Sequence, residues 1–167
     1  MIIGNELAKL VEGMTIDVDG NTVGIKHTFD DQYALEKFIK ELDSRSLAKF
    51  PMIFFVTSKV TGERLLSSKR EIVIMTNTNP DWLSKDRTAN TYTKVIQPIY
   101  EKLIPLIDKA RPFKIKGDRQ KRIEFIDKTN YGIVNGGISK ATSKASVVTD
   151  YVDARTITLE LEYNINC

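Results

Sequence analysis

The sequence is poor in the residues that build metal and redox sites. Its 167 residues include one cysteine, Cys167, and one histidine, His27. A single cysteine excludes a disulfide framework within the chain and a cysteine-rich zinc site, and a single histidine excludes a multi-histidine metal site. His27 falls in an alternating strand pattern and Cys167 is the last residue, so neither is expected to carry chemistry. We therefore expect no cofactor and no bound metal.

Long apolar runs are also missing. No run approaches the roughly 18 residues that a membrane-spanning helix requires. The N-terminus shows no basic stretch followed by an apolar one, so no signal peptide is expected. Hydrophobic residues still make up 41% of the chain, which is enough for a folded core. We expect one soluble domain over residues 1–167, kept in a reducing compartment and without membrane contact.

The formal net charge of +3 is unevenly distributed along the chain. Residues 1–108 sum to −1, residues 109–144 to +7 and residues 145–167 to −3. A basic, glycine-containing segment can meet phosphates or an acidic protein surface, and it can equally be a solvated loop. We expect a basic arm or hairpin insertion over residues 111–147. Its candidate contacts to another subunit or to DNA are Lys114, Lys116, Arg119, Lys121, Arg122, Lys128, Lys140 and Lys144.

The first third of the chain predicts a helix, a hairpin and a second helix. Residues Asn5–Glu12 have a helical apolar stripe, with Asn5 as the expected N-cap. Apolar residues then alternate over Met14–Phe29 on both sides of the turn sequence Asp19-Gly20-Asn21, which indicates a hairpin. Asp30-Asp31 is expected to begin the second helix, because acidic side chains favour a helix N-terminus.

The middle of the chain predicts two buried strands and a long helix. Phe50–Val56 is a continuous apolar run, and Glu71–Thr76 is a second interior strand. The polar connection Ser58–Lys69 contains no helix, so the two strands are expected to pair antiparallel. Asn77–Asn90 reads as a loop. Thr91–Ala110 has a broad apolar face, with two interior prolines expected to interrupt or bend the helix.

The last third predicts short strands and one regular strand. Phe113 and Ile115 alternate with lysines, and Arg122–Ile126 is a candidate strand joined to them by a turn at Gly117-Asp118. Thr156–Ile165 alternates strictly, which indicates one packed and one solvated face. We expect this strand to lie at an edge and to offer a docking surface. The fold class is therefore α+β: a mixed, mainly antiparallel sheet flanked by two to three helices, with an extended basic hairpin or arm.

No arrangement of residues predicts catalysis. Gly132–Lys140 superficially resembles a phosphate-binding loop but lacks the Gly-Lys-Ser/Thr ending and a following helical pattern. The paired acids Asp17/Asp19 and Asp30/Asp31 fit a turn and a helix start better than a metal site. A nucleophile would need a base beside it, and none is evident. We expect that this protein is not an enzyme. Of the functions considered, an enzyme that uses acid and base carboxylates has the least support in the sequence.

The order of elements, together with short hydrophobic signatures, resembles a known family. The signatures are Phe50-Pro51-Met52-Ile53-Phe54-Phe55, then Ile72-Val73-Ile74-Met75, then Val95-Ile96-Gln97-Pro98-Ile99-Tyr100-Glu101-Lys102-Leu103, and finally Asp150-Tyr151-Val152-Asp153-Ala154 leading into Thr156–Tyr163. This pattern resembles the tail terminator (tail completion) proteins of tailed bacteriophages and the related head–tail joining, or neck, proteins. The resemblance extends over most of the chain.

The resemblance implies a virion structural protein, assembled in the host cytoplasm, that is not an enzyme and needs no cofactor. Such proteins form homo-oligomeric rings, usually hexameric, that cap the tail tube and meet the head connector, with DNA passing through the lumen. The basic segment would then contact a neighbouring subunit, the tail tube or the passing DNA. The alternative from a different class is a nucleic-acid-binding accessory protein that uses residues 109–144.

Overall fold

Two 14-residue strands form the centre of the sheet. β5 (Leu65–Thr78) and β8 (Tyr151–Asn164) pair antiparallel along their whole length. β4 (Met52–Val56) pairs antiparallel with the other side of β5, and β3 (Lys26–Asp30) pairs parallel with β4. The second side of β8 carries two short strands, β6 (Phe113–Ile115) and β7 (Ile123–Lys128). The predicted α+β class with a mixed, mainly antiparallel sheet is confirmed.

This architecture comes from a computed structural model that describes residues 2–40, 50–57, 59–62, 64–79, 81–117, 123–129, 131 and 151–164. Most of the expected basic arm, including Arg119, Lys121, Arg122, Lys140 and Lys144, lies outside these residues. The loop sequence Gly132–Lys140 lies outside them as well.

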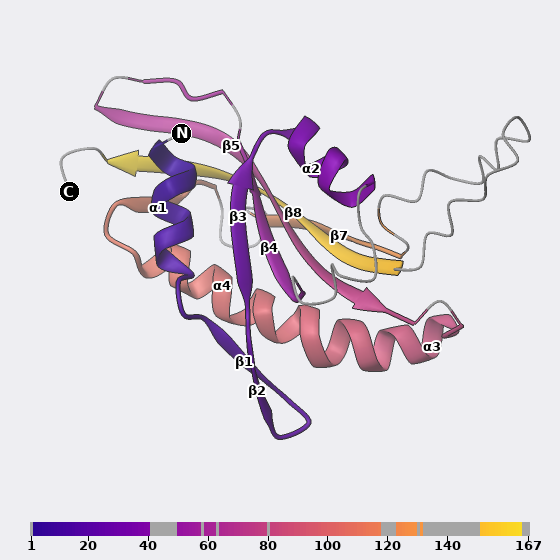
Figure 1. The fold of residues 1–167 in the computed structure, drawn as a ribbon. Helices are drawn as coiled ribbons and strands as arrows, with labels where there is room; N and C mark the ends of the chain where they lie inside the picture. The colour runs from indigo at the N-terminus through magenta and orange to yellow at the C-terminus, as the bar shows by residue number, and fades with distance from the viewer. Residues whose placement is uncertain are drawn as a thin grey trace, which may run out of the picture.

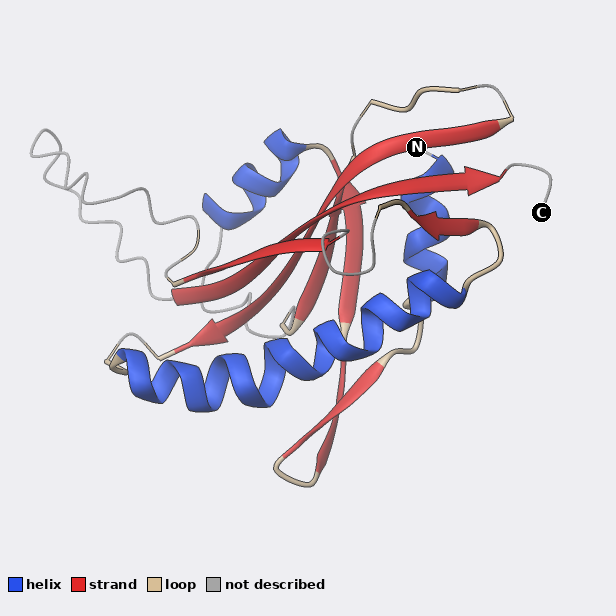
Figure 2. Cartoon of the chain, turned by 180° about the vertical axis from the view of Figure 1, so that it is seen from behind, coloured by secondary structure: helices blue, strands red, loops and turns tan. Residues whose placement is uncertain are grey.

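The helices cover the two faces of the sheet unequally. One face carries α1 (Ile2–Leu10) and a long helix made of α3 (Ser84–Arg87), η2 (Thr88–Ile96) and α4 (Gln97–Lys109) (Figure 2). The opposite face carries α2 (Gln32–Lys40), whose Leu35 is fully buried against strand residues such as Phe54 and Met75. Strand residues therefore alternate between a large core under the long helix and a smaller core under α2.

A small hairpin projects from the body of the molecule. β1 (Thr15–Val18) and β2 (Asn21–Gly24) pair antiparallel, as the turn sequence predicts (Figure 1). Both turn residues have positive φ, 53° at Asp19 and 82° at Gly20, which matches the twist of a two-residue hairpin. Lys94 on η2 binds the Asp19 carboxylate at 2.9 Å, so the long helix holds the tip of the hairpin.

Three expectations for the first half of the chain are wrong in detail. The first helix begins at Ile2, so Asn5 lies inside it and is not its N-cap. The hairpin ends at Gly24, and the following residues form β3 in the main sheet. β5 begins at Leu65, well before the expected Glu71, because its early residues pair with the far end of β8. The expected N-cap of α2 is confirmed, since the Ala34 N–H donates to the Asp31 carboxylate at 2.8 Å.

The expected loop over Asn77–Asn90 is too long, and the expected interruption of the long helix at its prolines is wrong. Helix begins at Ser84 and continues to Lys109 through the nine-residue π-helix η2. Proline cannot donate to the carbonyl four residues earlier, and its ring clashes with that carbonyl in an α-helix. The wider π turn precedes Pro98, and the Gln97 N–H donates to the Tyr92 carbonyl five residues back. The helix therefore passes through Pro98 without ending.

The last third of the chain also differs from its prediction. β6 and β7 do not form a hairpin with each other; both pair with β8, in line along the same side. β8 begins at Tyr151 and lies inside the sheet, so it is not the exposed edge strand that its alternation indicated. Its first half is buried on both faces, because it passes between the long helix and the α2 layer.

Candidate assembly surfaces

The first open edge of the sheet is β3. Within the described residues β3 pairs only with β4. The Lys26 N–H donates to the Pro51 carbonyl at 2.9 Å, and the Asp30 carbonyl accepts from the Thr57 N–H at 2.7 Å. Because backbone groups alternate in direction along a strand, the N–H and C=O groups of His27 and Phe29 point away from β4. These are the groups that an added strand would bind.

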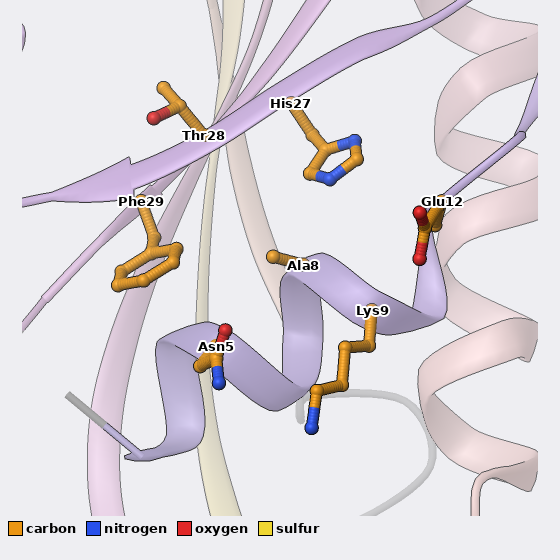
Figure 3. A pocket seen from close by; sticks show the side chains of 7 residues that line it. All are labelled: Asn5, Ala8, Lys9, Glu12, His27, Thr28 and Phe29. Atoms are coloured by element: carbon orange, nitrogen blue, oxygen red, sulfur yellow. The ribbon is translucent and has the colours of Figure 1, made fainter.

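A groove of about 320 Å³ runs beside this edge, between β3 and α1 (Figure 3). Strand and helix each supply one wall, with the lining residues Asn5, Ala8, Lys9, Glu12, His27, Thr28 and Phe29. The helix approaches the strand closely at Gly4, where an added Cβ would lie 3.0 Å from the Phe29 ring. On the exposed side of α1, Lys9 pairs with Glu6 at 2.6 Å, and this contact raises the pKa of Lys9.

The second open edge is β7, on the far side of the sheet. Within the described residues β7 pairs only with β8. All its residues after Ile123 are exposed. Two of them are large and apolar: Phe125 is 48% exposed and Ile126 is 63% exposed. Apolar side chains on an unpaired strand favour association with another surface.

Arg155 of β8 fixes the position of β7. Its Nε and second guanidinium nitrogen bind the two carboxylate oxygens of Asp127 at 2.6 and 2.8 Å, and its remaining nitrogen donates to the Gln97 side chain. The guanidinium carbon also lies 4.3 Å from the centre of the Phe125 ring and 5.2 Å from that of Tyr100. A bidentate carboxylate contact and aromatic stacking both suit arginine. The exposed strand is therefore tied to β8 and α4.

A buried ion pair holds the start of the long helix against β8. The Arg87 guanidinium binds the Asp153 carboxylate at 2.9 Å, and both side chains are more than nine-tenths buried. Arg87 also donates to the Trp82 carbonyl, and Thr91 shares a buried hydrogen bond with Thr78. Burial, with the nearby carboxylates of Asp153 and Asp127, raises the pKa of Tyr92 well above its usual range. The polar cluster keeps η2 in register over the strands.

Three candidate lysines of the basic segment lie among the described residues, and each has a different environment. Lys116 lies 3.3 Å from Glu160 and 3.2 Å from Glu162, and hydrogen bonds to Glu162 and Glu160 raise its pKa. Lys114 is exposed on β6, where Glu162 is its partner in the strand register. Lys128 lies over the ring of Tyr131, 5.3 Å from its centre. The structure does not bring these three lysines together into one patch.

The open edges of this site escape prediction from the sequence. They depend on which strands become neighbours, and those neighbours are far apart in the chain. The ion pairs have a visible signal, however: Asp153 and Arg155 occupy the same strand face as Ile157 and Leu159 and therefore need partners in the core. Phe125 and Ile126 are adjacent in β7, and adjacent strand residues point to opposite faces of the sheet. At least one of these two apolar side chains must therefore face away from the main core.

The described residues contain no group of three or more histidine, cysteine, aspartate or glutamate side chains that could hold a metal ion. Within the same residues, no helix is long and apolar enough to cross a membrane. In comparisons with known proteins, neither a family model nor a curated sequence matches this chain.

Proposed function

We propose that this protein is a virion structural protein that forms a homo-oligomeric ring at the head–tail junction of a tailed bacteriophage. The ring caps the tail tube and joins it to the head connector. The observation that carries the proposal is a six-stranded sheet in which, among the residues that the structure describes, β3 and β7 each pair with one strand only. The hydrophobic signatures that resemble tail terminator and neck proteins support the phage assignment.

Two unlike edges favour a ring over a simple dimer. An interface between two different surfaces of the same molecule is heterologous, and repeated heterologous contacts close into a ring when the rotation per subunit permits. An interface between two identical edges would instead stop at a dimer. The projecting β1–β2 hairpin adds a contact element on the same body, with its tip held by the Lys94–Asp19 ion pair.

The contacts of Lys116 favour a protein-facing role over a phosphate-binding one for this part of the basic segment. Lys116 is held between two glutamates, and Lys114 lies beside one of them in the register. A lysine already paired with carboxylates releases few counterions on meeting DNA, so it contributes little to phosphate affinity. This arrangement suits a ring through which DNA passes without being retained.

The test is to measure the oligomeric state and tube binding of the purified chain. Sedimentation should give one closed oligomer at high protein concentration or on addition of tail tubes from the same phage, and electron microscopy should show it at the tube end. A chain that stays monomeric at high concentration and never associates with tubes would refute the proposal. Binding to random duplex DNA with a steep salt dependence would favour the nucleic-acid-binding alternative.

A further inference from the structure

The hydrogen bonds of β8 show which of its backbone groups face β7. The Glu160 carbonyl accepts from the Lys116 N–H at 2.9 Å, and the Val152 carbonyl accepts from the Tyr131 N–H at 2.6 Å. Both donors lie on the side of β8 that carries β6 and β7. Because backbone groups alternate in direction along a strand, the even-numbered residues of β8 face this side.

The register then identifies the outward backbone groups of β7. Glu124, Ile126 and Lys128 lie opposite even-numbered residues of β8, so their backbone groups face β8. The N–H and C=O groups of Phe125 and Asp127 therefore point away from the sheet. Among the residues that the structure describes, no strand pairs with β7 on that side. An added strand would bind these groups.

A second copy of β7 fits this pattern when the two strands pair antiparallel about a two-fold axis that is perpendicular to the sheet at Ile126. Phe125 of each copy then lies opposite Asp127 of the other, and these two residues exchange both of their backbone hydrogen bonds. The axis keeps both faces of the sheet, so α2 lies on the same side in both copies. The pairing uses the outward backbone groups of both β7 strands.

The side chains on the α2 face of this joint are complementary. Ile126, which is 63% exposed, meets its own copy at the axis, and Glu124 of each copy lies opposite Lys128 of the other. These three residues occupy non-hydrogen-bonded positions of the new pair, where facing side chains are closest. The joint therefore buries an apolar pair between two pairs of opposite charge.

The other face of the joint is already ordered in each copy. Arg155 binds both carboxylate oxygens of Asp127, and its guanidinium carbon lies 4.3 Å from the centre of the Phe125 ring. The two Phe125 rings, each 48% exposed, come to diagonal positions across the joint, which aromatic side chains can span. A strand held in place before its partner arrives has a lower ordering cost of association.

The edge at β3 matches itself less well. Lys26 and Asp30 alternate in charge around Thr28 much as Glu124 and Lys128 do around Ile126. The central residue of β3 is polar, however, and self-pairing of β3 would bury no large apolar side chain at its axis. Burial of apolar surface is the main driving force of association, so β7 is the favoured edge.

We infer that β7 binds β7 of a second copy of this chain, which joins the two sheets into one. The contact is isologous and ends at a dimer. It goes beyond the proposed ring, because a β7 strand engaged in this pair is not available to a ring contact. The dimer is therefore the state of the free chain before a ring forms.

Charge reversal tests this contact in the full chain. Glu124→Lys and Lys128→Glu each bring like charges together twice in a symmetric pair, so each should weaken dimerisation about tenfold or more in analytical ultracentrifugation. Mixing the two variants, or combining both changes in one chain, should restore the dimer. Lys26→Glu is the matched control on the opposite edge and should leave dimerisation unchanged. Circular dichroism and urea unfolding establish that each variant folds.

Cross-linking tests the position of the axis. Ile126→Cys, made together with Cys167→Ser, should give a disulfide-linked dimer on mild oxidation, because its two copies face each other at the range that a disulfide spans. Leu83→Cys in the same background is the control, since Leu83 is also exposed, at 74%, and lies outside β7. It should cross-link far more slowly.

Four results would each overturn the inference: a wild-type chain that stays monomeric at high concentration, a combined charge exchange that does not restore the dimer, equal cross-linking of the two cysteine variants, or loss of the dimer in Lys26→Glu. The last result would assign the contact to β3. These measurements use no tail tubes, so they succeed or fail independently of the proposed function.

Discussion

The buried ion pair between Arg87 and Asp153 makes the strongest prediction about stability. Asp153 is fully buried on β8, and Arg87 approaches it from the start of the long helix at 2.9 Å. Asp153→Ala leaves the arginine buried without its carboxylate, and Arg87→Met leaves the carboxylate buried without its cation. Each single change should therefore destabilise the fold strongly.

The magnitude follows from the charges and their burial. Two unit charges about 4 Å apart attract by about 4 kcal/mol at an effective dielectric constant near 20. Removing one partner of a buried pair typically costs about 3–5 kcal/mol, because an uncompensated charge remains. The double variant leaves neither charge behind, so it should cost no more than either single variant.

Urea unfolding of the four proteins in this cycle measures the free energies directly. The control is Asp19→Asn, which breaks the exposed Lys94–Asp19 pair at a position with positive φ that asparagine tolerates. It should change stability by less than about 1 kcal/mol. If the costs of the two buried substitutions simply add, the two side chains do not act as a pair and the reasoning is wrong.

Three further predictions concern single positions. Gly62→Ala should destabilise by about 1–3 kcal/mol in urea unfolding, because φ is +108° and the new Cβ would meet the Leu65 carbonyl oxygen at 2.1 Å; an unchanged midpoint would contradict this. Arg70→Met should stabilise by about 1–3 kcal/mol, because burial lowers the pKa of Arg70 and two of its buried nitrogens have no hydrogen-bond partner among the described residues; a loss of stability would show that the guanidinium is satisfied. Hydrogen bonds from Ser67 and Lys116 lower the pKa of Glu160, so their stabilising effect is present at neutral pH and disappears as pH falls through that lowered pKa. Ser67→Ala should raise the pKa of Glu160 in an NMR titration, and an unchanged value would contradict the assignment.

Elements with a strong local signal could be predicted from the sequence. The apolar run Phe50–Val56 and the Asp19-Gly20 turn each specify their own conformation, since burial on both faces and two positive φ angles suit few alternatives. Asp31 likewise identifies the start of α2, because its carboxylate accepts the Ala34 N–H. In these cases the residues that decide the structure are neighbours in the chain.

Elements whose conformation depends on distant partners could not be predicted. Ser84–Asn90 is rich in polar residues, which predicts a loop, yet it is helical, and its Arg87 pairs with Asp153, 66 residues away. The strict alternation from Thr156 onward indicates a half-solvated strand, but it does not reveal that β6 and β7 occupy its second side. The strands at the edges of the sheet are therefore determined by long-range pairings, which cannot be recognised from the residues of any one strand.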